Sequence, residues 1–165
     1  MGSADLSAGM SVFWWLLLAS KLLHGYNTST SRVRRVYFVW QVESLDIVIV
    51  AQPLLNGLLT DDVLDGGYIL EMSIYVESGI DVEDQKSIGK HNQAVVYNNV
   101  PDYVKIVSSE VSGDYIPRLP NTQEECGELL VLVSVSDKLR DHLRSIVRGY
   151  FNQKVRLMEV EFQPF

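Results

Sequence analysis

Residues 34–42, RRVYFVWQV, constrain the fold of this chain more than any other segment. Their β-branched and aromatic side chains follow one another with almost no polar residue between them. A strand with one solvent-exposed face alternates apolar and polar residues, whereas a nearly continuous apolar segment is typical of a strand buried on both faces. Because such a strand needs helices on both sides of its sheet, this segment indicates an α/β protein with a mainly parallel sheet.

The other apolar segments alternate between the helical and the extended pattern. We expect helices at residues 11–24, 44–59, 101–111 and 136–150, and strands at residues 34–42, 68–76, 93–97, 128–135 and 155–162. Segment 44–59 is ambiguous, since its four successive β-branched residues favour a strand while its length favours a helix that Pro53 would disturb. Strands that alternate with helices imply parallel crossovers, so we predict a doubly wound sheet in a single domain over residues 1–165.

The starts of the helices and the ends of the strands mark where a ligand would bind. Ser11 is expected to cap the first helix, and Pro101 suits the first turn of the third because that position needs no amide donor. In a doubly wound sheet, ligands lie in the loops beyond the carboxyl ends of the strands. Those loops are residues 5–11, 40–44, 97–102 and 134–137. The architecture thus predicts the place of a site and leaves its function open.

Charge and residue types exclude several classes of function. The formal net charge of −7 argues against a nucleic-acid partner, because phosphate binding needs a concentrated positive surface. Cys126 is the only cysteine, which favours a reducing compartment and a cytoplasmic protein. Lys21 interrupts the apolar stretch at residues 12–19 too early for a direct membrane span. The three histidines lack metal-ligand spacing, so we expect no metal site.

The four loops and their flanking strands resemble the C-terminal NAD(P)H-binding region of the ferric reductase and NADPH oxidase family, particularly the fungal metalloreductases. Residues 6–11 stand where this family has a Gly-Gly-x-Gly-type loop before an apolar helix, and residues 34–40 match its V-Y-F-V-W strand. Residues 72–77 resemble a strand of the I-x-I-Y-V-T type. Residues 99–102 resemble a Gly-Arg-Pro-Asp segment, and residues 134–137 take the place of a Cys-Gly-Pro loop.

The resemblance implies a ferredoxin-reductase-type NAD(P)H-binding lobe of a flavohaem ferric-chelate reductase or an NADPH oxidase-like protein. In intact relatives, NADPH or NADH passes hydride to FAD and the electrons then cross to haem. The implied partners are an FAD-binding domain and a membrane haem domain, which would hold the lobe at the cytoplasmic face of a membrane. The cofactor-contacting positions are Gly9, Met10 and Ser11 for phosphate, Trp40 and Pro101 near the ribose, Asp102 beside them, and Ser134 near the nicotinamide.

Three nucleotide-contacting motifs depart from the family pattern. Leu6 and Ser7 stand where two glycines are expected, and a leucine side chain there would crowd the phosphates. Val100 replaces the arginine before Pro101, and residues 134–136 replace Cys-Gly-Pro. These losses favour a second hypothesis, a non-catalytic interaction module that kept the scaffold and lost nucleotide binding. A third, flavodoxin-like reading needs a phosphate loop after the first strand, for which residues 41–44 are a poor candidate.

The start of the chain poses a separate problem for this fold. Only residues 1–5 precede the first loop, too few for the central strand that comes first in the family. Without that strand the sheet would keep two unpaired edges, which proteins rarely leave open. We therefore predict an edge filled from another chain, with self-association as one form of this, or by an unexpected segment of the same chain.

Overall fold

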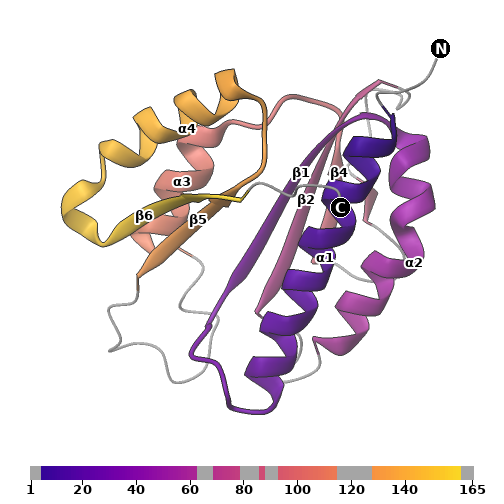
Figure 1. The fold of residues 1–165 in the computed structure, drawn as a ribbon, viewed down its shortest axis with the longest axis horizontal. Helices are drawn as coiled ribbons and strands as arrows, with labels where there is room; N and C mark the ends of the chain where they lie inside the picture. The colour runs from indigo at the N-terminus through magenta and orange to yellow at the C-terminus, as the bar shows by residue number, and fades with distance from the viewer. Residues whose placement is uncertain (1–4, 63–68, 79–85, 88–92, 115–127, 161–165) are drawn as a thin grey trace. The chain divides into compact units, whose positions relative to one another are not determined.

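The computed structural model describes residues 5–62, 69–78, 86–87, 93–114 and 128–160 (Figure 1). Backbone contacts divide the chain into two compact units, unit 1 over Met1–Pro101 and unit 2 over Asp102–Phe165. Both units combine helices with parallel strand pairs, which confirms the α/β class. The single domain over residues 1–165 stays a prediction.

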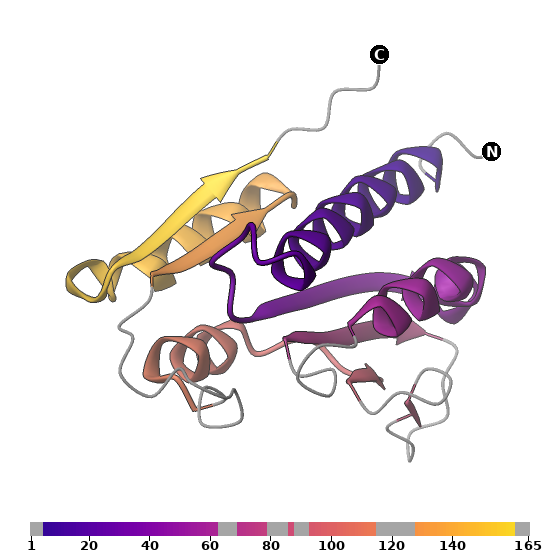
Figure 2. The ribbon, with the colours of Figure 1, turned by 90° about the horizontal axis from the view of Figure 1, so that it is seen from below.

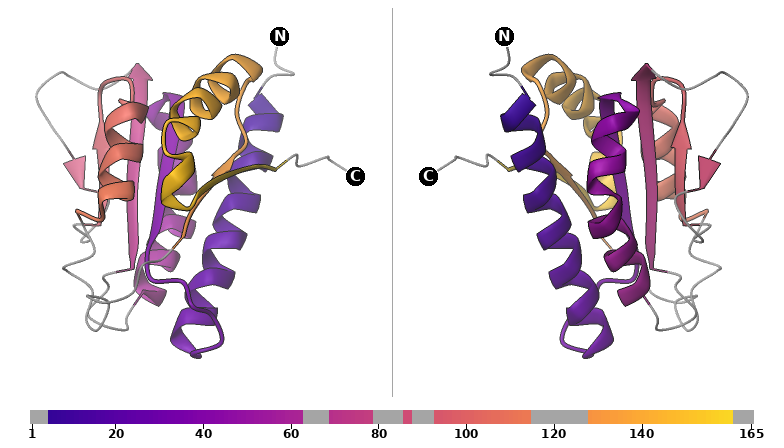
Figure 3. Two further views of the ribbon diagram at one scale, coloured as in Figure 1. Left: turned by 90° about the vertical axis from the view of Figure 1, so that its left-hand side faces the viewer. Right: turned by 90° about the vertical axis from the view of Figure 1, so that its right-hand side faces the viewer.

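Unit 1 contains a four-stranded sheet in the order β1-β2-β4-β3. Its elements are α1 (Asp5–Asn27), β1 (Val36–Ser44), α2 (Leu45–Asp61), β2 (Leu70–Ser78), β3 (Lys86–Ser87) and β4 (Ala94–Tyr97). The pairs β1–β2 and β2–β4 are parallel, and the short β3 runs antiparallel to β4. Figure 3 shows α1 and α2 side by side on one side of this sheet.

The register of the parallel strands creates one apolar face. Phe38 pairs with Met72, Trp40 with Ile74 and Val42 with Val76. Side chains alternate between the two faces of a sheet, so these residues point the same way. Val42, Met72, Ile74 and Val76 of this face form the core with buried apolar residues of α1, α2 and β4: Leu16, Ala19, Leu23, Val48, Leu55, Leu58, Leu59, Ala94 and Val96.

The first helix differs from the sequence expectation at its start. The sequence predicts a loop at residues 5–11 and a cap at Ser11, but α1 already begins at Asp5. An acidic residue at a helix N-terminus is favourable there, and residues 5–11 contain no proline that would stop a helix. The predicted helix start at Ser11 is therefore wrong, and α1 also continues past the predicted end at residue 24, to Asn27.

The ambiguous segment after β1 is helical. α2 runs through all four β-branched residues and through Pro53, and its buried Val48, Leu55 and Leu58 recur at helical spacing. Ser44 is its N-cap residue with φ −140° and ψ 154°, as predicted, although its side chain makes no capping hydrogen bond. Burial of this apolar helix face outweighs the strand propensity of the β-branched residues.

Unit 2 contains a two-stranded parallel sheet and two helices (Figure 2). Its elements are α3 (Tyr103–Ser112), β5 (Leu129–Val133), α4 (Asp137–Arg148), the 3₁₀ helix η3 (Phe151–Gln153) and β6 (Val155–Glu159). The β5–β6 register aligns Leu129 with Val155 and Val133 with Glu159. The buried apolar residues of unit 2 are Val107, Val133, Leu143, Val147 and Val155.

The sheet arrangement agrees with the predicted fold only at the coarse level. The predicted strands appear within a few residues of their expected bounds, but the described strands form two sheets instead of one doubly wound sheet. Residues 77–93 are acidic and polar, which predicts a surface loop, yet strand β3 lies among them and pairs with β4. The Asp-Gly-Gly sequence at residues 65–67 predicts a turn, and residues 112–127 are predicted to form a loop. The turn and most of this loop lie outside the described residues.

Candidate functional site

The residues expected to bind phosphate lie within a helix. Gly9, Met10 and Ser11 belong to the second turn of α1, four or more residues past its start at Asp5. Backbone amides beyond the first turn of a helix are engaged by carbonyls of the preceding turn. These three amides therefore cannot form the phosphate-cradling loop that the sequence suggests.

Trp40 and Pro101, expected near the ribose, occupy different parts of unit 1. Trp40 lies in the middle of β1 on its apolar face, with its ring centroid 6.5 Å from that of Phe38. Pro101 is buried and follows β4, outside the helix whose first turn it was expected to open. Helix α3 begins later, at Tyr103, so the predicted role of Pro101 as a first-turn residue is wrong.

The remaining two expected residues lie in unit 2. Asp102 is the N-cap of α3, and its carboxylate accepts the backbone N–H of Lys105 at 3.1 Å. Ser134 directly follows β5 and is half-buried. Ser136 caps α4 by position, as predicted, and its side chain makes no capping hydrogen bond. Asp102 thus has a structural role in this helix, whereas Ser134 stands at a strand end where a ligand contact is feasible.

A row of polar and aromatic side chains lies on the sheet of unit 1, and the sequence patterns did not predict it. We call it the polar face; it consists of Arg35, Tyr37, Gln41, Glu71, Ser73, Tyr75, Glu77 and Tyr97. The guanidinium of Arg35 pairs with Glu71 at 3.0 Å and lies 5.4 Å from the centroid of the Tyr37 ring. An ion pair and two side-chain hydrogen bonds therefore link odd-numbered residues of the two strand segments: Arg35 to Glu71, Tyr37 to Ser73 and Gln41 to Glu77.

The centre of the polar face is a part-buried pair of hydroxyl groups. The Tyr37 hydroxyl lies 2.7 Å from the hydroxyl of Ser73, which is 2% exposed. Burial raises the pKa of Tyr37 above its usual range, although the hydrogen bond with Ser73 opposes this shift. Tyr37 therefore stays neutral at physiological pH and is not poised to act as a general base.

The carboxyl end of the polar face has the most suitable groups for a ligand. The amide of Gln41 donates to the Glu77 carboxylate at 2.8 Å, and both residues are exposed. Next to Glu77 along β2, Tyr75 stacks on Tyr97 with centroids 5.0 Å apart and an interplanar angle of 17°. A carboxylate at this end of a parallel sheet can accept hydrogen bonds from sugar hydroxyls, and aromatic rings can contact planar groups.

The sequence does contain a signal for this arrangement. Glu71, Ser73, Tyr75 and Glu77 alternate with the apolar residues of β2, so their spacing places them on one face of a strand. Their partners on β1 are about 36 residues away in the sequence. Only the strand register shows that Tyr37 meets Ser73 and that Gln41 meets Glu77.

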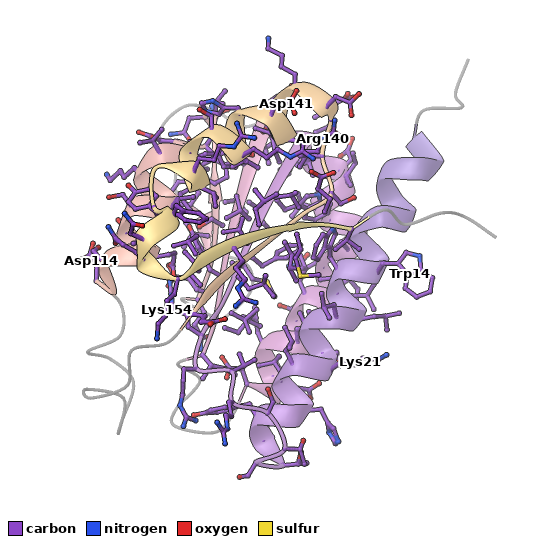
Figure 4. The ribbon with its side chains drawn as sticks, turned by 60° about the vertical axis from the view of Figure 1, so that its left-hand side comes forward. Trp14, Lys21, Asp114, Arg140, Asp141 and Lys154 are labelled. Atoms are coloured by element: carbon purple, nitrogen blue, oxygen red, sulfur yellow. The ribbon has the colours of Figure 1, made fainter. Side chains whose placement is uncertain are left out.

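Two arginines of α4 in unit 2 form ion pairs with carboxylates. Arg140 pairs with Asp137 at 2.9 Å, and Arg144 pairs with Asp141 at 3.3 Å and with Glu159 of β6. Figure 4 labels Arg140 and Asp141 on this helix. Because these guanidinium groups are already neutralised, this part of α4 is a poor anion site.

The described part of the chain lacks two features that would indicate a function, and the comparisons with known proteins identify no relative. Within the described residues, no group of three or more His, Cys, Asp and Glu side chains is placed to hold a metal ion. The helices of that part of the chain also lack the length and apolarity to cross a membrane. The chain matches no family model, and neither a curated protein nor a solved structure matches it.

Proposed function

We propose that this chain is an NAD(P)H-binding-type lobe of a flavohaem metalloreductase or NADPH oxidase-like protein. One observation supports the proposal: two β-α-β arrangements, β1–α2–β2 and β5–α4–β6, each pair parallel strands around a helix. In both, the helix begins close to the end of the first strand, α2 at Leu45 after Ser44 and α4 at Asp137 after Val133. Strand-to-helix junctions of this kind are where α/β proteins bind nucleotides.

The groups that remain favour weak nucleotide binding. The amides of Gly9, Met10 and Ser11 are engaged within α1, so the pyrophosphate would have to bind elsewhere. The hydroxyls of Ser44 and Ser136 make no capping bonds and are available at two helix starts. Within unit 1, Glu77 would accept ribose hydroxyls. The contact of Ser134 with a nicotinamide, which the family resemblance implies, stays a prediction. Hydride transfer to FAD would require a separate FAD-binding domain.

Titration of the full chain with NADPH and NADH tests this function. Calorimetry is expected to show binding, and Glu77→Gln should weaken it about tenfold, because hydrogen bonds to a charged group are worth about 1.5–3 kcal/mol. Asp114→Asn is the matched control, since it also removes one carboxylate but from an exposed position after α3. Equal affinity in both variants would contradict the assigned role of Glu77.

A second candidate function is a non-catalytic interaction module. The continuity of α1 through Gly9, Met10 and Ser11 favours it, because this helix occupies the segment that would form the phosphate loop. Calorimetry could show no heat of binding at millimolar NADPH or NADH while circular dichroism shows a folded α/β protein. This result would rule out nucleotide binding by the lobe. The same result is the one expected for the module.

A further inference from the structure

We propose that two copies of this chain associate through their β1 strands, which pair antiparallel about Val39. This inference concerns an interface between copies and does not depend on nucleotide binding. It rests on the position of β1 at a sheet edge, on the direction of its backbone groups and on the order of its side chains.

Strand β1 is a long and apolar edge strand. It stands at the end of the order β1-β2-β4-β3, and within the described residues no strand pairs with its other side. Phe38, Val39 and Trp40 remain partly exposed, whereas Met72 and Ile74 of the neighbouring β2 are 0% exposed. An exposed edge of this length and composition is a template for pairing with another strand.

The backbone of β1 presents its odd-numbered residues to this edge. The amide of Val36 donates to the carbonyl of Ile69 at 2.6 Å, so Val36 directs its backbone groups toward β2. Backbone groups alternate along a strand, so Phe38 and Trp40 do the same, and Tyr37 and Val39 direct theirs away from β2. The outward groups are therefore those that a further strand would bind.

The side chains of β1 are complementary to a reversed copy of themselves. With Val39 opposite Val39 of the second copy, Tyr37 faces Gln41 and Arg35 faces Glu43. Tyr37, Val39 and Gln41 lie within β1 at odd-numbered positions, so they form pairs of the type that exchanges hydrogen bonds, and Arg35 directly precedes the strand. On the opposite face of the sheet, Phe38 faces Trp40 and Val36 faces Val42.

These pairings are of the kinds that stabilise antiparallel strands. Opposite charges, aromatic pairs and β-branched pairs are each favourable across neighbouring strands, while like charges are not. If the centre of the pairing moves to Tyr37, Phe38 lies opposite Val36. If it moves to Gln41, Trp40 lies opposite Val42. Either shift separates Arg35 from Glu43. Among the possible centres along β1, only Val39 places Arg35 opposite Glu43, and it also places Phe38 opposite Trp40 and Val36 opposite Val42.

The resulting interface has closed two-fold symmetry. Each copy supplies the same surface, so the two four-stranded sheets would join and both open β1 edges would disappear. Arg35, Gln41 and Glu43 also have partners within their own chain, among them Glu71 for Arg35 and Glu77 for Gln41. The association adds contacts to these residues and does not require them to be free.

Sedimentation of the full-length chain over a range of concentrations gives the first test. The wild type is expected to form dimers, and Val39→Pro should weaken the association about tenfold or more, because proline removes an outward amide. An edge strand tolerates proline at such a position, since that amide has no partner within the sheet of unit 1. Glu43→Arg, which keeps the backbone intact, should also weaken the dimer by placing two cations opposite each other.

Disulfide trapping distinguishes this interface from any other. In a Cys126→Ser background, Val39→Cys places two cysteines opposite each other, about 5.5 Å apart between Cα atoms, which suits a disulfide. Mild oxidation is expected to cross-link Val39→Cys dimers. Val50→Cys is the control, since Val50 is 81% exposed on α2 and away from the edge.

Two outcomes would overturn the proposal. One is a wild type that sediments as a monomer at every concentration up to its solubility limit. The other is a dimer that resists both Val39→Pro and Glu43→Arg, or that cross-links through Val50→Cys and not Val39→Cys. Neither outcome bears on nucleotide affinity, so this test and the titration fail independently.

Discussion

Asp62 is a buried carboxyl group at the junction between α2 and β2. Its side chain accepts the amide of Leu70 at 2.9 Å, while its other carboxylate oxygen, Oδ1, has no hydrogen-bond partner in the described part of the chain. Burial raises the pKa of Asp62 above its ordinary value, and the backbone bonds from Leu70 and Ile69 lower it in part. The charged form of Asp62 is therefore a cost that the folded protein bears near neutral pH.

The pH dependence of stability should show this cost. Because the folded state holds the Asp62 proton more tightly than the unfolded state, protonation of Asp62 stabilises the folded protein. This stabilisation is complete at acidic pH, below the ordinary pKa of the Asp62 carboxyl group. It is lost as pH rises from there through the raised pKa. Urea unfolding across this range is expected to show that loss in the wild type, and Asp62→Asn should reduce it. An unchanged pH profile in Asp62→Asn would contradict the assignment.

Replacing Asp62 by alanine should have a different effect. Asp62→Ala removes the acceptor of the buried Leu70 amide, so it should lower the free energy of unfolding by about 1–3 kcal/mol. Asn keeps an oxygen for this amide and serves as the matched comparison. Urea unfolding at neutral pH measures both variants, and equal stability of Ala and Asn would show that the Leu70 bond contributes nothing.

The hydroxyl pair of Tyr37 and Ser73 allows a sharper test at the same scale. Tyr37→Phe leaves the buried Ser73 hydroxyl without its partner and should cost about 1–2 kcal/mol. The double variant Tyr37→Phe/Ser73→Ala removes both groups and should cost less than the sum of the single variants. Denaturant unfolding of all four proteins gives the coupling energy, and strict additivity would show that the bond does not matter.

At the scale of elements, two helical glycines make a contrasting pair. A Cβ added at Gly25 in α1 would lie 2.8 Å from Cβ of Ser31, in the turn that follows this helix. A Cβ added at Gly57 in α2 would meet nothing within 4 Å. The same substitution should therefore have opposite effects in the two helices.

We expect Gly25→Ala to destabilise the protein by about 1–3 kcal/mol, because the turn must shift to accommodate the methyl group. Gly57→Ala should stabilise it by about 0.5–1 kcal/mol, because alanine loses less backbone entropy in a helix than glycine. Thermal unfolding of both variants measures the difference. A drop in melting temperature for Gly57→Ala would mean that the exposed surface of α2 is covered in solution.

The elements also show how far sequence patterns reach. The spacing of Leu139, Leu143, Ile146 and Val147 predicts α4 well, and Leu143 and Val147 are buried. The start of α1 was missed because the family resemblance suggested a loop at residues 5–11, although nothing in those residues stops a helix. The sequence places the ends of β1 and β2 within two residues of Ser44 and Ser78, whereas the Gln41–Glu77 pair depends on strand register.

At the scale of the whole molecule, self-association would couple stability to concentration. A partner that binds only the folded state raises the apparent melting temperature as its concentration increases. The wild type should therefore melt at higher temperature when it is more concentrated, and Val39→Pro should lose most of this dependence. Differential scanning at several concentrations measures the effect, and an identical dependence in both proteins would argue for a different interface.

The sequence by itself determined most of the helices and strands and which of their residues are apolar, because periodicity is a local property of the chain. Segment 44–59, strand β3 and the start of α1 are the exceptions. The tertiary structure alone decided that β2 lies between β1 and β4, that the described strands form two sheets, and that Tyr37 meets Ser73. These features depend on contacts between residues far apart in the sequence, where many pairings satisfy the same local pattern. Packing and register select one of them.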